Sequence, residues 1–361
     1  MNEKGRNILP MIGFILIVAV LLGGFAMAKS FGKGVQLFDN KRETGISIKN
    51  NRKSSPLGGY SIDDSGSVST SGMNEISISG VSSEISIETH NSDKVEAHFY
   101  GNVTTSNQDA LPYLEVVREG NTAVVRVKYP NVKNVSINGK TSLDVKIPED
   151  WAQDLEVSSV SGRITTQELT GENVKLNTTS GDIEVDNITA DDIVFQSVSG
   201  SFNLSNLKAN GTISKNTISG SCTINEAQAE KIALESTSGS TTIHNADADK
   251  VTSTSISGAV EVNLSRGSAE MATTSGEILV RFEEDFDGFS ANSVSGGVRL
   301  EIPENSEFKV DINTISGEIR CNDFSMKILS SKRNQLQAEA GNGGSRIEIR
   351  TTSGSVDISK R

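Results

Sequence analysis

Apolar and polar residues alternate in short stretches through residues 151–361, and the alternation repeats with a nearly constant period. A Ser-Gly pair marks one phase of the repeat, with gaps of 18 to 21 residues between successive glycines and one final gap of 37. A period near 19 residues with a turn signal at constant phase is typical of a solenoid, in which each repeat forms one coil stacked on the next. The glycines are Gly162, Gly181, Gly200, Gly220, Gly239, Gly258, Gly276, Gly296, Gly317 and Gly354.

Each repeat carries apolar pairs at fixed distances from its glycine. In one repeat Val174 and Leu176 precede Gly181, and Ile183 and Val185 follow it. Alternation with period two indicates a strand with one buried face. Each coil therefore contains at least two short strands. A weaker third pair suggests another strand where the coil turns back, and it fades in the later repeats.

The corner between the two clear strands has the sequence T-S-G or I-S-G in most repeats. Glycine adopts positive φ without steric cost, and serine bonds readily to nearby backbone. We therefore expect positive φ at the repeat glycines and a ladder of serines along the stacked coils. The 37-residue gap predicts one degenerate coil between Gly317 and Gly354. A last strand at Ser355–Ser359 would then close the stack, with Lys360 and Arg361 discouraging further strand pairing.

Residues 74–150 are rich in strand signals but lie off the repeat, and we interpret them as a β-rich N-terminal capping region. Glu119-Gly120-Asn121 has the composition of a hairpin turn. The predicted fold class is all-β: a β-solenoid, parallel β-helix-like, with about 19 residues per coil, this cap and one N-terminal transmembrane helix. The candidate strands of the cap are 75–79, 84–88, 94–100, 113–118, 122–128 and 143–147.

Two further segments precede the cap. Residues 29–73 lack apolar periodicity and are predicted to be a flexible linker. Residues 8–28 form an uncharged run long enough to span a bilayer. We interpret residues 1–28 as a transmembrane anchor rather than a cleaved signal segment, because the run is long for a signal-peptide core. Cleavage after Ala28, which ends a small-x-small motif, is the alternative.

The charged residues bear on the orientation of the protein in the membrane and on the partners that it binds. Lys29 and Lys33 follow the apolar run, so the positive-inside count does not favour an external C-terminus. Long domains are often translocated regardless, and we expect a single-pass protein of the cell membrane with its C-terminal domain outside the cytoplasm. The net charge of −12 argues against nucleic acid and against direct binding of anionic lipid by the domain. The expected partners are the membrane, through residues 8–28, and a cell-wall glycan or an envelope protein.

No catalytic, cofactor-binding or metal-ligating set emerges from the sequence. His90, His98 and His244 share no metal-ligand spacing, and common catalytic motifs are missing. Cys222 and Cys321 take inward positions about five coils apart, too far for a disulfide. They are predicted to be buried free thiols, with an enzymatic thiol as the alternative.

Two sets of polar residues on the outward face each leave more than one interpretation open. The acidic residues 182, 184 and 186 and the cluster 283–287 are interpreted as solvated charge, with weak calcium binding or a carboxylate-based sugar-processing site as alternatives. A polar column four residues before each glycine presents either a soluble strand surface or a face that binds glycan or protein. The residues are Asp182, Glu184, Asp186, Glu283, Glu284, Asp285 and Asp287, and Asn177, Gln196, Asn216, Thr254, Asn292 and Asn313.

The repeats S-V-S-G-R-I, T-S-G-D-I-E-V, S-V-S-G-S-F-N-L and T-I-S-G-E-I resemble the bacterial DUF4097 family, also labelled putative adhesin. The upstream segments I-S-I-S-G-V-S-S-E-I-S-I-E and D-K-V-E-A-H-F-Y-G extend the resemblance over about residues 74–361. It implies an envelope-associated β-solenoid, often membrane-anchored and linked to envelope stress, and it brings no catalytic residues. The leading hypothesis is a membrane-tethered, extracytoplasmic, non-enzymatic binding or scaffold module. The alternatives are a self-assembling β-helix like bactofilins and a polysaccharide-active β-helix enzyme.

Overall fold

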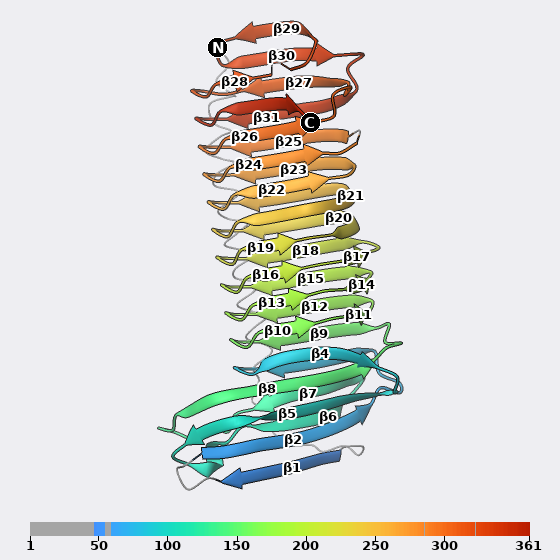
Figure 1. The fold of residues 1–361 in the computed structure, drawn as a ribbon, viewed down its shortest axis with the longest axis vertical. Coiled ribbons are helices and arrows are strands. Elements are labelled where there is room, and N and C mark those ends of the chain that lie inside the picture. The colour runs from blue at the N-terminus through green and yellow to red at the C-terminus, as the bar shows by residue number, and fades with distance from the viewer. Residues whose placement is uncertain (1–46, 55–58, 285, 322) are drawn as a thin grey trace. The chain divides into compact units, whose positions relative to one another are not determined.

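The computed structural model describes residues 47–54, 59–284, 286–321 and 323–361 (Figure 1). These residues form two compact units, a first unit up to Asn203 and a second unit from Leu204 onward. Strands dominate both, and the described ranges contain a single short 3-10 helix, η2 (Gln108–Ala110). Across the same ranges no helix is long and apolar enough to span a bilayer. The anchor predicted at residues 8–28 lies outside them.

The first unit combines a stack of parallel coils with antiparallel strands. Antiparallel pairs join β1 to β2, β2 to β5, β5 to β8 and β6 to β7, with Gly120 at φ 62° in the predicted hairpin turn. All six strands predicted for the cap are present. The strands before β9 are β1 (Ser47–Ser54), β2 (Gly59–Ser69), β3 (Glu75–Gly80), β4 (Glu84–His90), β5 (Lys94–Thr105), β6 (Tyr113–Glu119), β7 (Thr122–Lys128) and β8 (Ile137–Pro148).

Strand β2, like β1 before it, lies where the sequence predicts a flexible linker, so that prediction is wrong for residues 47–54 and 59–69. The strand buries Ile62, Asp64 and Val68. Only two of these positions are apolar, and the charged residue between them hides the alternation. Inside the unit, Asp64 Oδ2 accepts a hydrogen bond from the backbone N–H of Leu114 at 3.2 Å, which connects β2 to β6. The buried carboxylate therefore helps to fix the layer that the sequence pattern missed.

Strands β3 and β4 form a coil of the stack, so the interpretation of residues 74–150 as an off-repeat cap is wrong for residues 75–90. They pair in parallel with β9 and β10, matching Ile76 with Leu155 and Ile85 with Ile164. Ser83 takes the corner position in this coil, since a Cβ built on Gly162 would meet the Ser83 carbonyl oxygen. A search for Ser-Gly corners passes over this coil for that reason.

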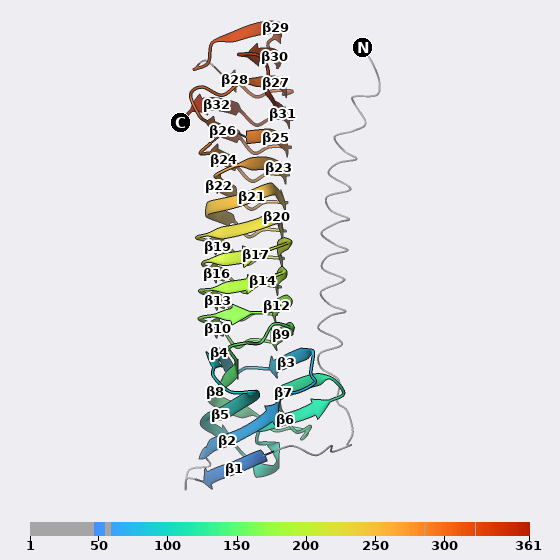
Figure 2. The same cartoon turned by 90° about the vertical axis from the view of Figure 1, so that its right-hand side faces the viewer.

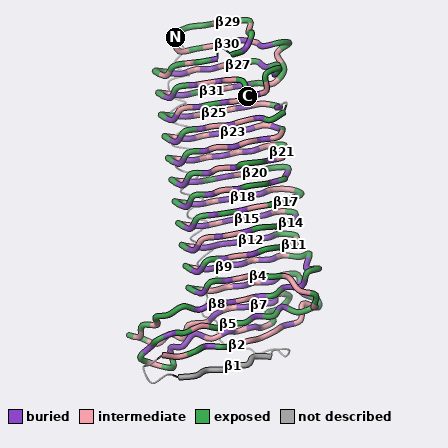
Figure 3. The backbone as a smooth tube through the Cα atoms, in the orientation of Figure 1, coloured by how far each residue is buried: buried purple, intermediate pink, exposed green. Residues whose placement is uncertain are grey.

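The later coils of the first unit have three strands each, which confirms the third strand suggested by the sequence. Parallel pairing matches β12 with β9 on one side and β15 on the other, so that Val174 lies beside Leu155 and Ile193. Buried and more exposed residues alternate along these strands (Figure 3). The strands are β9 (Asp154–Ser159), β10 (Ile164–Thr166), β11 (Leu169–Thr170), β12 (Asn173–Thr178), β13 (Ile183–Val185), β14 (Ile188–Ala190), β15 (Asp192–Ser197) and β16 (Phe202–Leu204).

The repeat glycines do not adopt positive φ, contrary to the expectation from the corner sequence. Close approach between neighbouring corners explains instead why glycine is required at these positions. A Cβ on Gly181 would lie 2.1 Å from the carbonyl oxygen of Gly162, and a Cβ on Gly276 would lie 2.0 Å from that of Gly258. Such separations are too short for any side chain. Each corner glycine packs on the glycine of the neighbouring corner, and this contact leaves no space for a side chain.

Hydroxyl groups form two ladders beside the glycines. The exposed serine before the glycine donates to a carbonyl of the adjacent coil, as Ser295 Oγ does to Thr274 O at 3.2 Å, which confirms the predicted serine ladder. A second, buried hydroxyl three residues before each glycine accepts the glycine N–H at 2.7 to 3.1 Å. This buried column is Ser159, Thr178, Ser197, Thr217, Ser236, Ser255, Thr273, Ser293, Thr314 and Thr351.

The second unit continues with parallel coils. Strand β20 runs through two sides of a coil and β21 runs through three, because the turns between these sides become extended. Its strands are β17 (Leu207–Ala209), β18 (Thr212–Thr217), β19 (Cys222–Ile224), β20 (Ala227–Ser236), β21 (Thr241–Ser255), β22 (Val260–Leu264), β23 (Gly267–Thr273), β24 (Ile278–Phe282), β25 (Phe286–Ser293), β26 (Val298–Ile302), β27 (Phe308–Asn313), β28 (Ile319–Arg320), β29 (Met326–Lys332), β30 (Gln335–Ala340), β31 (Ser345–Thr351) and β32 (Val356–Lys360).

The last coil of the sequence is not the last coil of the stack. Strand β31 pairs in parallel with β25 and β27, and β32 pairs with β26 and β28 (Figure 2). The corner of Gly354 therefore packs between those of Gly296 and Gly317. The prediction that Ser355–Ser359 closes the stack is wrong. Lys360 instead binds Glu304, with Nζ 2.8 Å from Oε1.

An antiparallel hairpin, β29–β30, lies within the 37-residue gap, where a degenerate coil was predicted. Strand β30 pairs antiparallel with β27, and Ala338 and Ala340 are buried. The spacing between successive corner glycines gives a number of residues but not the direction of the strands between them. A hairpin and a coil of similar length therefore produce the same spacing. The hairpin lies beyond the coil of Gly317 and ends the described part of the second unit.

Candidate functional site

The outward faces of β2, β5 and β8 present a regular grid of polar side chains in the first unit. Along β5, Val95, Ala97 and Phe99 point into the core, which leaves Glu96, His98 and Tyr100 on the outside. The antiparallel register with β2 and β8 aligns each of these residues with one residue on either side. The rows are Asp63, Tyr100 and Ser142; Ser65, His98 and Asp144; and Ser67, Glu96 and Lys146.

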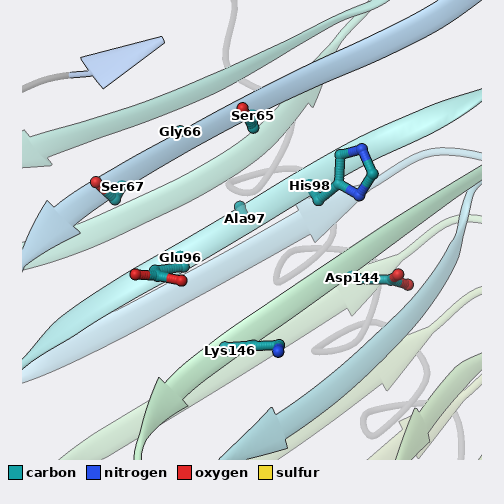
Figure 4. Close-up of a pocket in the computed structure, with 8 residues that line it drawn as sticks. All are labelled: Ser65, Gly66, Ser67, Glu96, Ala97, His98, Asp144 and Lys146. Atoms are coloured by element: carbon teal, nitrogen blue, oxygen red, sulfur yellow. The ribbon is translucent and has the colours of Figure 1, made fainter. Parts of the chain in front are cut away.

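An open depression of about 470 Å³ lies over two of these rows (Figure 4). Strand β5 supplies its middle, and β2 and β8 supply its sides. Carboxylates, hydroxyls, one imidazole and one ammonium group therefore face a common space. Its lining residues are Ser65, Gly66, Ser67, Glu96, Ala97, His98, Asp144 and Lys146.

His98 and Tyr100 form an aromatic pair at the edge of the depression. Their rings stack with centroids 4.7 Å apart, and His98 Nε2 lies 2.8 Å from Asp63 Oδ1. The side chains of His98 and Asp63 are about half exposed, so this hydrogen bond adds little to stability, but it orients the imidazole. The negative charge of Asp144 raises the pKa of Tyr100, and burial adds to this shift, so the phenol stays a neutral hydrogen-bond donor.

The other histidines and the cysteines are apart from this site. His90 Nε2 lies 2.7 Å from Lys94 O in a turn, and His244 is exposed on the outward face of its coil. Cys222 and Cys321 are buried free thiols, as predicted. Burial raises the pKa of Cys222 to about 11 and that of Cys321 to about 12, so both thiols are protonated at neutral pH. A protonated, buried thiol is a poor nucleophile.

The acidic residues of the coils form surface ion pairs. Arg163 lies 3.2 Å from Glu184 and 3.9 Å from Asp182, and Arg361 lies 3.1 Å from Glu283. Asp285 lies outside the described residues. Within the described ranges no three potential metal ligands gather closely enough to hold an ion. The arrangement favours solvated charge over a metal site or a sugar-processing carboxylate pair.

The side chains of the polar column four residues before each glycine are less accessible to a ligand than those of a fully exposed face. Asn177 is only 4% exposed, and its Nδ2 donates to Glu156 Oε1 at 3.1 Å. The other members are half-buried: Gln196, Asn216, Thr254, Asn292 and Asn313. These side chains pack against neighbouring coils, which favours the interpretation as a strand surface.

Sequence reasoning missed two charged residues in the interior, Asp64 and Lys215. Lys215 is completely buried in β18, at the repeat position that Leu176 takes before Gly181. Its Nζ donates to Thr241 Oγ1 at 3.2 Å, and burial lowers the pKa of its ammonium group. A basic residue five positions before Gly220 was the signal in the sequence.

The fold and its repeats define a β-solenoid protein. A family model described as Toastrack DUF4097 matches residues 73–212 and 199–359. The chain belongs to this family.

Several solved structures match this chain over most of their length. A putative adhesin from Parabacteroides distasonis is 16% identical, with 81% of this chain and 95% of that one covered and a TM-score of 0.46. A putative adhesin from Bacteroides fragilis is 13% identical, with 90% and 100% covered and a TM-score of 0.34. A putative lipid binding protein from Parabacteroides distasonis is 16% identical, with 89% and 100% covered and a TM-score of 0.36. No curated protein matches the sequence.

Proposed function

We propose that the protein is a membrane-tethered, extracytoplasmic β-solenoid that binds a glycan of the cell envelope without enzymatic activity. The observation that carries this proposal is the depression on β2, β5 and β8. Its stacked aromatic pair and its row of carboxylates and hydroxyls lie on a rigid sheet. The apolar run 8–28 supplies the tether.

The side chains around the depression suit a polyhydroxylated ligand. Carboxylates accept hydrogen bonds only, and serine hydroxyls both donate and accept. Glu96 and Asp144 can therefore take the hydroxyl protons of a sugar, while Tyr100, 37% exposed, offers a ring face to its C–H groups. A sheet whose inner face is fully packed holds these groups at fixed spacing, which limits the entropy lost on binding.

End-to-end polymerisation, the alternative related to bactofilins, is not favoured by the strand directions. The first unit begins with the antiparallel pair β1–β2, and the described part of the second unit ends in the antiparallel hairpin β29–β30. Neither presents the open parallel coil that a neighbouring molecule would extend. The strand directions at these two ends therefore support a protein that does not polymerise through its coils.

Binding of the full chain to wall glycan from host cells tests the ligand site. Tyr100→Ala should weaken binding by tenfold or more, because the stacking face is lost. Tyr129→Ala is the matched control, since Tyr129 bonds Ser82 outside the depression and should leave binding unchanged. Equal binding by the wild type and Tyr100→Ala would refute the site.

Protease shaving of intact cells tests the location separately. Digestion of a C-terminal tag from outside, with a retained fragment near residues 1–30, is the expected result. Protection that persists after the wall has been removed would place the solenoid inside and contradict the proposal.

A further inference from the structure

The hairpin at the end of the second unit exposes aliphatic side chains that a coil would bury. Ile328 is 61% exposed and Leu329 is 57% exposed, both in β29, the outermost strand of this unit (Figure 1). Ile315, in the corner of the adjacent coil, is 62% exposed. The comparable corner residue Val294 is 36% exposed because further coils follow it.

The geometry of the hairpin explains this exposure and places the three residues at the same end of the second unit. Ile328 is paired with the buried Ala338, but no described strand covers the other side of β29. The register shifts between Ile328 and Ser330, so Leu329 lies in a bulge. At the turn, Asn334 O accepts the Thr314 N–H at 2.9 Å, which places the turn beside Ile315.

Three cations surround these aliphatic residues. Lys327, Lys332 and Arg333 are exposed, and none forms an ion pair with another described residue. Other cations at this end are paired, as Lys309 is with Glu339 at 3.4 Å. We call Ile315, Lys327, Ile328, Leu329, Lys332 and Arg333 the hairpin patch.

The charge of the hairpin patch differs from that of the chain around it. Residues 324–338 contain three basic residues and no acidic one, whereas residues 59–361 contain 25 basic and 43 acidic residues. The net charge therefore disfavours contact with anionic lipid for the domain as a whole, whereas the charge of this hairpin does not. A local cluster of cations is felt within roughly a Debye length, about 10 Å at 0.1 M salt.

A second copy of the chain is a poor occupant for the hairpin patch. Face-to-face contact would oppose three cations with three cations, and three aliphatic side chains supply far less than the roughly 800 Å² per partner of a stable interface. Strand addition at β29 is disfavoured by its bulge and by Lys327 and Lys332, which are common devices that protect sheet edges. An occupant with many anionic groups above an apolar layer fits better.

We propose that the hairpin patch docks on the surface of an anionic lipid bilayer. Ile315, Ile328 and Leu329 would enter the boundary between headgroups and acyl chains, while the cations bind lipid phosphates. The proposal rests on the membrane location given under the proposed function and is independent of the glycan site. It gives the chain a second, reversible membrane contact in addition to the segment 8–28.

A fluorescent label on the full chain tests the proposal. Leu329→Cys is labelled with an environment-sensitive dye, and the buried native thiols, with their raised pKa, should not react. The labelled chain is reconstituted in phosphatidylcholine vesicles with or without phosphatidylglycerol. We expect a blue shift and a several-fold increase in emission only with the anionic lipid. The same label at Val294→Cys is the control and should not respond.

Charge variants and lipid-free samples distinguish docking on lipid from association with a second copy of the chain. Replacing Lys327, Lys332 and Arg333 with Gln should weaken docking by roughly fivefold per residue and abolish the shift. Unchanged emission in anionic vesicles that contain the chain would overturn the inference while leaving the anchor intact. A concentration-dependent shift without lipid would overturn it in favour of a second copy. If the chain fails to insert, the anchor is refuted, and the same dye measured on added vesicles still tests the hairpin patch.

Discussion

The coils and the C-terminal end of the fold depend on different kinds of contact. The coils repeat the same contacts at a constant spacing along the chain, whereas the C-terminal end depends on contacts that follow no such spacing. In the coils, each glycine corner, buried hydroxyl and apolar pair contacts its equivalent about 19 residues away. At the C-terminal end, Ser353 Oγ reaches Val294 O across 59 residues, and β30 runs antiparallel to β27. A periodic sequence therefore specifies what a coil looks like, and the order in which coils stack depends on contacts that no period records.

Disrupting the inserted coil should have the largest effect. Val356, completely buried in β32, lies between Val298 of β26 and Ile319 of β28. Val356→Asp would bury an unpaired charge and should destabilise the unit by about 4 kcal/mol or more. Hydrogen exchange should show lost protection in both β26 and β28. Ser359→Asp, on the half-exposed face of the same strand, is the control and should change stability little.

The glycine column offers a matched pair of adjacent residues. A Cβ on Gly296 would lie 1.8 Å from the Gly276 carbonyl oxygen, whereas a Cβ on Gly297 has its nearest neighbour, Ser355 O, at 3.6 Å. Gly296→Ala should cost about 3 to 5 kcal/mol and Gly297→Ala less than about 1 kcal/mol. Denaturant unfolding measures both. Similar values for the two variants would refute close corner stacking.

Lys215 tests how a charged residue fits an apolar column. Lys215→Met should stabilise the chain by about 1 to 4 kcal/mol at neutral pH, because a buried ammonium group is replaced by an apolar side chain. Burial lowers the folded-state pKa below the usual 10.5. Between these two values the unfolded state binds more protons, so wild-type stability rises with pH and the advantage of Met shrinks. An advantage that is constant up to pH 10.5 would contradict a buried, depressed lysine.

The buried hydroxyl ladder should have the smallest effect. Ser293→Ala leaves the buried Gly296 N–H without its 2.9 Å acceptor and should cost about 1 to 3 kcal/mol. Ser293→Thr should restore most of the stability, since threonine takes this position in other coils. Ser295→Ala, at the exposed serine of the same corner, should cost less than about 1 kcal/mol. Equal losses from the buried and exposed serines would argue against the ladder.

Much of the coil could be predicted from sequence because its determinants are local. The alternation of Ile183 and Val185 and of Val174 and Leu176 specifies strands directly. The role of the corner glycines could not be predicted, because close approach by the neighbouring coil depends on stacking. A glycine that is required because φ is positive cannot be distinguished in a sequence from one that is required because a neighbouring coil packs closely against it.

The ends of the fold and the candidate site were harder to predict. Strand β2 keeps a buried Asp64 where alternation calls for an apolar residue, and Ser83 replaces glycine at one corner. The depression depends on the antiparallel register of β2, β5 and β8, which brings Ser65 and Asp144 to the two sides of His98. A single sequence contains the residues of this site and no record of the register that aligns them.

Disulfide mapping tests the out-of-order stacking most directly. Arg299 and Asp357 are paired on adjacent strands, and Arg320 lies on the other side of Asp357. Adjacent parallel strands lie about 4.8 Å apart, while strands two apart lie about 9.6 Å apart, beyond the roughly 7 Å limit for a disulfide. The account predicts a cross-link in Arg299→Cys with Asp357→Cys and none in Arg299→Cys with Arg320→Cys. The reverse result, a cross-link between positions 299 and 320 only, would show that the coils stack in sequence order and would contradict the account.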